Sequence, residues 1–133
     1  MFIIVKSKRM AQKYIEGDIV EYDNKVMVIK EPRNGSHFDL FCHKEGLVYC
    51  FVCVEDIKTV VLTPKILKKN GWKKFKRPYS SDYCYRRKGY TTLNIRSDKE
   101  VYFHWGDHDK SITTVHQLQH LLFGLGLNSE MEV

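Results

Sequence analysis

The sequence predicts a mixed α+β protein, a small SH3-like β-barrel followed by an α-β-β-β-α unit. Three observations lead to this fold class. Short runs that alternate apolar and polar residues fill the first half of the chain, which is typical of β-strands. A capped helical pattern then begins at residue 63, and another begins at residue 114. We therefore expect two domains, residues 1–61 with an N-terminal strand and the barrel, and residues 62–133 with the α-β-β-β-α unit.

Several short strands make up the predicted barrel. The runs GDIVEYD and KVMVIKE meet at Asp23, Asn24 and Lys25, a turn-forming sequence that favours a hairpin. HFDLFCH and GLVYCFVCV follow, separated by residues 44–46. Because closure removes the exposed edges that so small a sheet would present, we expect an SH3-like barrel over about residues 14–61.

The run LTPKILKKNGW changes the character of the chain. Thr63 is suited to cap a helix whose first position is Pro64, where the missing amide proton costs nothing. Asn70 and Gly71 supply the left-handed residue that ends such a helix. The sequence therefore predicts a short helix between these signals.

Strands are expected next at about residues 83–87, 90–96 and 101–105. Thr114 and Gln117 then form a capping box for a final helix that runs to about Phe123 and closes near Gly124 or Gly126.

The four cysteines are predicted to be free thiols. Cys50 and Cys53 have the spacing of metal ligands, but on a strand they point to opposite faces and cannot hold one ion. We expect packed thiols there and at Cys42 and Cys84. No apolar run approaches the roughly 20 residues that span a bilayer, so a cytoplasmic protein without a membrane partner is expected.

The net charge of +6 is concentrated in one segment. Between residues 65 and 88, Asp82 is the single acid among ten bases. These bases are Lys65, Lys68, Lys69, Lys73, Lys74, Lys76, Arg77, Arg86, Arg87 and Lys88. This segment supplies more than the whole net charge, which predicts a polyanionic partner.

Aromatic residues alternate with these cations in GWKKFKRPYSSDYCYRRKGY, a combination that binds phosphates and offers flat rings on which bases stack. Residues 73–77 are expected in an exposed loop. The alternative is that the aromatics form the core and the lysines only a solvated face. The candidate ligand-binding residues are Trp72, Lys73, Lys74, Lys76, Arg77, Tyr79, Arg86, Arg87, Lys88 and His116.

Two histidines of the final helix raise the question of a metal site. His116 and His120 lie four residues apart and share a helix face. Gln117 stands where zinc peptidases have a glutamate base, which argues against hydrolysis by that mechanism. A third ligand would have to come from His104, Asp107, His108 or Asp109. Because the leucines gather on the opposite side, we expect both histidines to face solvent or a partner, with no metal and no cofactor. The alternative is that they are ordinary structural histidines.

No enzyme signature is found elsewhere in the chain. The glycines are scattered and form no phosphate-binding loop, and no serine stands in a nucleophile elbow. Asp107 and Asp109 lack a third acid beside them for a metal-dependent nuclease. We therefore expect a protein without enzymatic activity.

The order of three motifs, GDIVEY, LTPKILKKNGW and VHQLQHLLFGL, resembles a family of small uncharacterised proteins of gut bacteria and their phages. The resemblance covers most of the chain and implies its architecture, but no activity, ligand or catalytic residue. The family commonly has asparagine at the position of His120, which counts against a metal site shared by the group.

Two classes of function remain. The first is a binding module for a phosphate-bearing ligand, either nucleic acid or a nucleotide. The phage resemblance suggests one form of it, an accessory protein that sequesters a nucleotide signal of host defence. The second is a protein-interaction adaptor that uses the barrel or the helix face of His116 and Phe123. A protein partner and a homo-oligomer both remain open.

Overall fold

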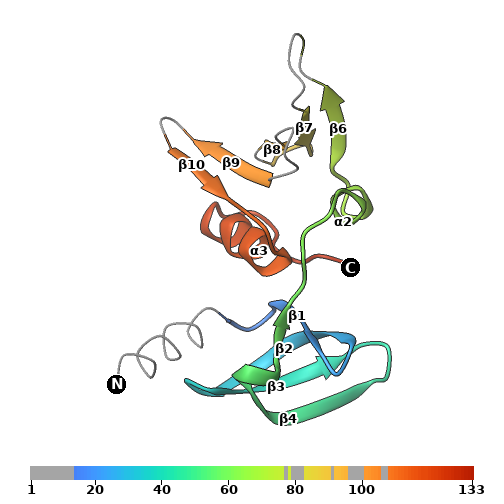
Figure 1. The fold of residues 1–133 in the computed structure, drawn as a ribbon, viewed down its shortest axis with the longest axis vertical. Coiled ribbons are helices and arrows are strands. Elements are labelled where there is room, and N and C mark those ends of the chain that lie inside the picture. The colour runs from blue at the N-terminus through green and yellow to red at the C-terminus, as the bar shows by residue number, and fades with distance from the viewer. Residues whose placement is uncertain (1–13, 77, 79–82, 91, 96–100, 106–107) are drawn as a thin grey trace. The chain divides into compact units, whose positions relative to one another are not determined.

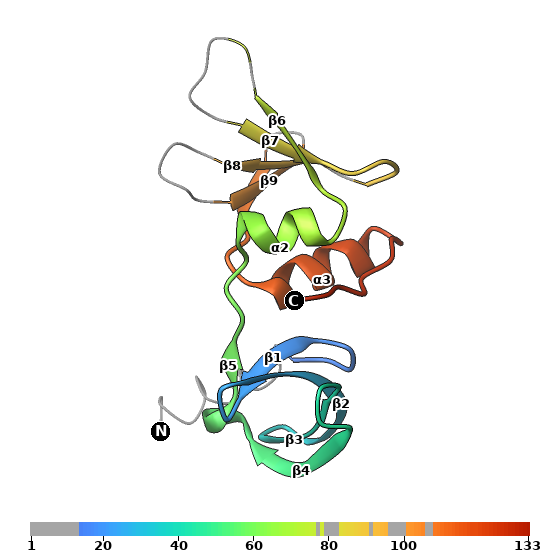
Figure 2. The ribbon, with the colours of Figure 1, turned by 90° about the vertical axis from the view of Figure 1, so that its right-hand side faces the viewer.

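The computed structural model describes residues 14–133 except 77, 79–82, 91, 96–100 and 106–107, and at 95, 102–105 and 108–110 it describes the backbone alone. The protein is of mixed α+β class and divides into two compact units, Met1–Val60 and Val61–Val133. In the described residues each unit contains its own five-stranded antiparallel sheet (Figures 1 and 2). None of the helices described is both long and apolar enough to cross a bilayer.

The first unit is a meander of short strands. Its elements are β1 (Ile19–Tyr22), β2 (Lys25–Asn34), β3 (His37–Cys42), β4 (Leu47–Cys53), the 3-10 turn η1 (Val54–Asp56) and β5 (Lys58–Thr59). Asp23 and Asn24 both have positive φ, 53° and 59°, as a two-residue hairpin turn requires. The predicted hairpin at these residues is confirmed, with Tyr22 opposite Lys25.

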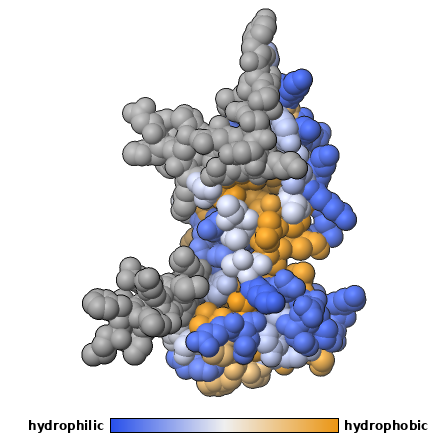
Figure 3. Space-filling view, viewed as in Figure 1, coloured by the Kyte–Doolittle hydropathy of each residue, from blue (hydrophilic) through white to orange (hydrophobic). Residues whose placement is uncertain are grey.

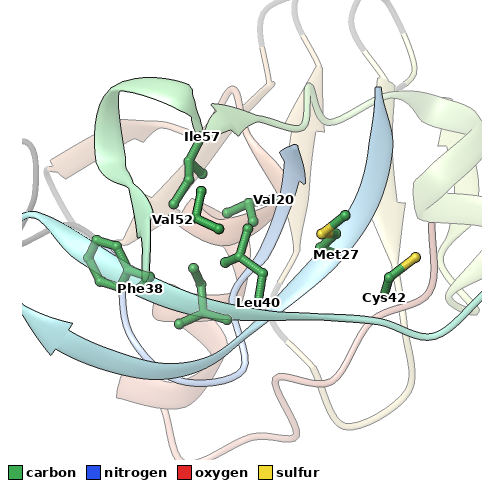
Figure 4. Packing of buried hydrophobic residues seen from close by; sticks show 8 residues of the cluster. Val20, Met27, Phe38, Leu40, Cys42, Val52 and Ile57 are labelled. Atoms are coloured by element: carbon green, nitrogen blue, oxygen red, sulfur yellow. The ribbon is translucent and has the colours of Figure 1, made fainter. Parts of the chain in front are cut away.

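One face of these strands forms the core of the first unit (Figure 4). Its buried side chains are Val20, Met27, Ile29, Phe38, Leu40, Cys42, Val52 and Ile57. The strand order is β4-β3-β2-β1-β5, so in the described residues the hydrogen bonding leaves β4 and β5 as the two ends of an open sheet. The closed SH3-like barrel therefore stays a prediction.

The second unit combines a sheet with two helices. Its elements are α2 (Pro64–Lys69), β6 (Lys73–Lys76), β7 (Tyr83–Arg86), β8 (Leu93–Ile95), β9 (Val101–Trp105), β10 (His108–Ser111) and α3 (Val115–Gly124). The strand order is β10-β9-β8-β7-β6, and both helices lie on one side of this sheet (Figures 1 and 2). The described residues of this unit thus contain five strands where the sequence predicts three.

The two strands that the sequence does not predict are β6 and β10. β6 reads KKFK and β10 reads HDKS, so neither has the alternating apolar residues by which a strand is recognised. Each is a strand because it pairs with a neighbour, β6 with β7 and β10 with β9. The expected loop at residues 73–77 is therefore wrong for Lys73–Lys76.

Both predicted helices are confirmed, together with their caps. The Thr63 hydroxyl accepts a hydrogen bond from Ile66 N at 3.3 Å, and Gly71 has a φ of 87° after the last turn of α2. Thr114 and Gln117 form the expected capping box of α3. These signals act within a few residues, which explains why the sequence predicts them well.

Candidate nucleic-acid interface

The pairing of β6 with β7 decides which residues of the basic segment lie together. Lys73 is opposite Arg86, and Phe75 is opposite Cys84. Opposite residues of an antiparallel pair project to the same face, and neighbours along a strand project to opposite faces. Lys73, Phe75 and Arg86 therefore share one face of the sheet.

These three residues, which we call the basic strip, are all exposed. The Arg86 guanidinium carbon lies 4.2 Å from the centre of the Phe75 ring, a cation–π contact. The Phe75 side chain is 42% exposed despite this contact. In Figure 3, hydrophilic side chains line the edge of the molecule at which β6 lies in Figure 1.

Two buried polar residues limit the basic strip on the same face. Cys84 lies opposite Asn94 of β8, and both are buried. The Cys84 thiol donates a hydrogen bond to Asn94 Oδ1 at 2.9 Å. The exposed part of this face therefore lies along β6 and at Arg86, not over the centre of the sheet.

The other face of the pair belongs to the core. Tyr85 is buried, and burial raises the pKa of its hydroxyl above the ordinary value. The Lys74 ammonium lies 4.0 Å from the centre of the Tyr83 ring, and Lys76 is exposed further along the strand. Lys74 thus covers the rim of an aromatic core, as the structural alternative for this segment required.

Trp72 does not lie on the surface. Its side chain is 2% exposed, and its ring meets that of Tyr90 edge to face at 5.9 Å. The reason is its place directly after α2, where its amide donates to the Leu67 carbonyl at 3.0 Å and the ring packs inward. A base has no access to this ring, so the proposed stacking role of Trp72 is wrong. Arg77 and Tyr79 lie outside the described residues.

Arg87 points away from the basic strip. Its guanidinium carbon lies 4.3 Å from the centre of the Tyr90 ring, and its side chain borders Gly71. It lines an open cleft of about 460 Å³ whose remaining walls are Lys69, Asn70, Gly71, Asn128, Glu130, Met131 and Glu132. Lys88 is exposed in the turn after β7. The predicted set of cations is therefore divided between a strand face, a cleft and a turn.

His116 is buried, which overturns the expectation that it faces solvent or a partner. Its side chain is 4% exposed, and its Nδ1 lies 3.2 Å from the Thr114 hydroxyl of the capping box. The buried stripe of α3 is wider than its leucines, because Val115, His116 and Gln119 are buried as well. A hydrogen-bond partner inside the cap makes burial of the polar ring tolerable. His116 is therefore unavailable to an external ligand.

The predicted metal ligands do not form a described site. The rings of His116 and His120 are 5.6 Å apart between centroids. Asp107 and the side chains of His104, His108 and Asp109 lie outside the described part of the chain. Within that part, no three histidine, cysteine, aspartate or glutamate side chains lie close enough to hold a metal ion.

The sequence did not predict the conformation of Phe51, an exposed aromatic residue of the first unit. Phe51 has a φ of 55°, which is rare for a bulky residue, and its side chain is 59% exposed. Its amide donates to Asp39 Oδ1 at 3.0 Å, and Arg33 Nε donates to Asp39 Oδ2 at 2.7 Å. Arg33 and the Phe51 amide hold the pKa of the Asp39 carboxyl below its ordinary value. No glycine or asparagine in YCFVC signals this backbone conformation.

The backbone irregularity at Phe51 also leaves the thiol of the preceding residue, Cys50, outside the core. The register of β3 and β4 shifts between the pairs at Phe38 and Leu40. All four cysteines are free, and Cys42 and Cys84 are buried as expected, with Cys53 partly so. Cys50 is exposed, so the expectation of a packed thiol is wrong there.

The two units differ in the ion pairing of their cations. In the first unit Lys25 pairs with Glu45 at 2.9 Å, and Arg33 pairs with Asp39 and Glu31. In the second unit, none of the described lysines and arginines between residues 65 and 88 forms an ion pair with a described aspartate or glutamate side chain. The basic strip therefore carries positive charge that the described fold does not neutralise.

Comparison of the chain with protein-family models, with curated proteins and with solved structures finds no match.

Proposed function

We propose that the protein is a non-enzymatic binding module for a phosphate-bearing ligand, and that the basic strip is its main contact. The observation that carries the proposal is the position of Lys73 directly opposite Arg86 on an exposed face, without a carboxylate from the described residues. Like charges opposite each other destabilise a strand pair. A polyanion removes this repulsion and releases counterions as it binds.

Protection of a sheet edge is the competing explanation for the lysines. In the described pairing β6 is an edge strand, and lysines on such a strand discourage the addition of another chain. This explanation does not apply to Arg86, which lies on the inner strand β7. It also does not account for the exposed ring of Phe75, because an exposed apolar side chain promotes association with other chains. A ligand accounts for all three residues of the strip.

The shape of the site favours nucleic acid over a mononucleotide. Sites for small molecules usually enclose most of the ligand, whereas the strip is an open strand face. The cleft at Arg87 and Lys69 has room for a nucleotide, but Glu130 and Glu132 in its wall repel phosphate. The narrower form of the proposal, a phage accessory protein that sequesters a nucleotide immune signal, has its support in the sequence resemblance alone.

The test is binding of a fluorescent oligothymidylate of about 12 nucleotides, followed by polarisation over a salt titration. We expect low-salt binding that weakens steeply as salt rises. The double variant Lys73→Glu/Arg86→Glu should lower the affinity at least about tenfold, because two phosphate contacts become two repelling charges.

Lys30→Glu/Lys58→Glu is the matched control, because it makes the same change in net charge at exposed positions of the first unit. Its affinity should stay near that of the wild type. The proposal fails if the wild type binds no oligonucleotide or nucleotide at low salt, or if both double variants lose affinity equally.

A protein-interaction adaptor is the second candidate, and an edge of the first unit favours it. Leu47, Val48 and Phe51 of β4 are exposed apolar residues, and β4 contains no charged residue. Within the described pairing β4 has a neighbour on one side only. On α3, Phe123 is exposed but His116 is not, so the predicted helix face would rest on Phe123. A protein complex that survives high salt and is lost in Val48→Lys supports this candidate.

We further infer that the first unit is an SH3-like barrel. The strand order β5-β1-β2-β3-β4 with a 3-10 turn before β5 supports this inference. Val52 of β4 and Ile57, which follows η1, pack in one core cluster, so the two ends of the sheet share a core. An experimental structure with β4 and β5 on opposite sides of that core would contradict the inference.

A further inference from the structure

Phe75 is the one aromatic residue of β6, and its partly exposed ring lies beside two cations. A phenylalanine ring that stays partly in water forgoes part of the free energy that its burial would contribute. The next two strands of the sheet, β7 and β8, bury Tyr85 and Leu93 in the core, so this sheet does have a buried face. The register places Phe75 on the opposite face, together with two cations.

Arg86 extends the flat surface that Phe75 begins. The guanidinium lies over the phenylalanine ring at 4.2 Å, and it is planar, so its outer side is a second surface for stacking. Bases of unpaired nucleic acid stack on aromatic rings and on arginine planes alike. Lys73, directly opposite Arg86, lies where it would meet the phosphate beside a base stacked there.

We infer that the ligand of the basic strip is single-stranded nucleic acid, with one unpaired base stacked on the Phe75–Arg86 pair and the adjacent phosphate bound by Lys73. This inference rests on the proposed function and names its ligand class. A duplex offers its phosphates to the strip, but its bases are already stacked on each other. The phenylalanine therefore discriminates between single strands and duplexes, which the lysines do not.

The decisive variant is Phe75→Leu, which keeps an apolar side chain at an exposed strand position and removes the ring. The probes are oligothymidylate, oligouridylate, a duplex of the same length and inorganic polyphosphate. We expect the variant to lose about 5- to 150-fold in affinity for the single strands, which is the usual range for one stacked base. Affinity for polyphosphate, which has no bases, should stay within about twofold.

Two further variants separate stacking from a change in the fold. Phe75→Tyr restores a ring and should recover most of the lost affinity. Phe123→Leu is the matched control, because it removes another exposed phenylalanine of the same unit at a site distant in sequence. It should bind every probe as the wild type does.

The outcomes distinguish this inference from the proposal on which it rests. If the wild type binds none of the four probes, the proposed function fails. If it binds them and Phe75→Leu changes nothing, or lowers all affinities equally, the stacking inference is overturned and phosphate binding stands. Equal affinity of the wild type for duplex and single strand also overturns the inference. Tighter binding of the wild type to oligouridylate than to oligothymidylate identifies RNA as the preferred source, and the reverse identifies DNA.

Discussion

The two units each place an arginine near an exposed phenylalanine, and the pairs differ in how the charge is neutralised. In the first unit Arg33 lies 5.6 Å from the Phe51 ring and binds the buried carboxylate of Asp39. In the second unit Arg86 lies 4.2 Å from the Phe75 ring, with no described carboxylate in ion-pair contact. An arginine that forms an ion pair with a carboxylate of its own unit contributes to the stability of that unit. One left unmatched on a surface with a second cation is available to a ligand.

The two units should differ most when each arginine is replaced in turn. Arg33→Met leaves the Asp39 carboxylate without its cation at a buried position, so we expect a marked fall in the melting temperature of the first unit. Arg86→Met removes an exposed charge and should change the stability of the second unit by no more than about 0.5 kcal/mol. Thermal unfolding followed by calorimetry measures both. Equal losses from the two variants would show that both arginines serve the fold.

Acid should weaken the first pair. The pKa of Asp39 is lowered in the folded protein, first by the hydrogen bond from Arg33 and next by that from the Phe51 amide. Such a carboxyl contributes stability that is present above its unfolded pKa of about 3.9 and is lost as pH falls through the lower folded value. We expect the first unit to lose stability below about pH 4, as measured by urea unfolding at a series of pH values.

Asp39→Asn should flatten this acid dependence, because the amide does not titrate. Part of the dependence should remain, since the pKa of Glu45 is also lowered, by Tyr49 and then by Lys25. Glu31→Gln is the control, because Glu31 is exposed and its contact with the Arg33 guanidinium is long, at 3.9 Å. An acid dependence that is the same in Asp39→Asn and the wild type would contradict the role given to this pair.

Replacing each of the two phenylalanines by glycine should change stability only slightly. Phe51→Gly relieves a left-handed backbone conformation that costs an ordinary residue about 1–2 kcal/mol, although glycine loses more entropy on folding. We expect stability to rise by about 0.5 kcal/mol or stay unchanged. Phe75→Gly has no strain to relieve, because Phe75 has no positive φ, and should destabilise β6 by about 1 kcal/mol. Urea unfolding distinguishes the two, and a loss of stability in both variants would show that the Phe51 side chain packs usefully.

Local signals in the sequence predicted much of the fold. The hairpin at Asp23 and Asn24, the Thr63 cap and the Thr114 capping box all depend on residues within a few positions of one another. The conformational preferences and hydrogen bonds involved are the same in any context, so the sequence determines them directly. The uneven distribution of charge is likewise a property of the sequence alone.

The composition of the candidate site depended on contacts that the sequence does not display. Trp72 and Phe75 stand three positions apart in one basic run, yet the first is buried and the second is exposed. KKFK became a strand because β7 pairs with it, and this pairing brought Arg86 opposite Lys73. His116 is buried because the buried face of α3 is wider than its leucines alone. Turns, caps and charge distribution thus follow from residues that are close in the sequence. Which rings and cations face outward together follows from strand pairing between segments that are distant along the chain.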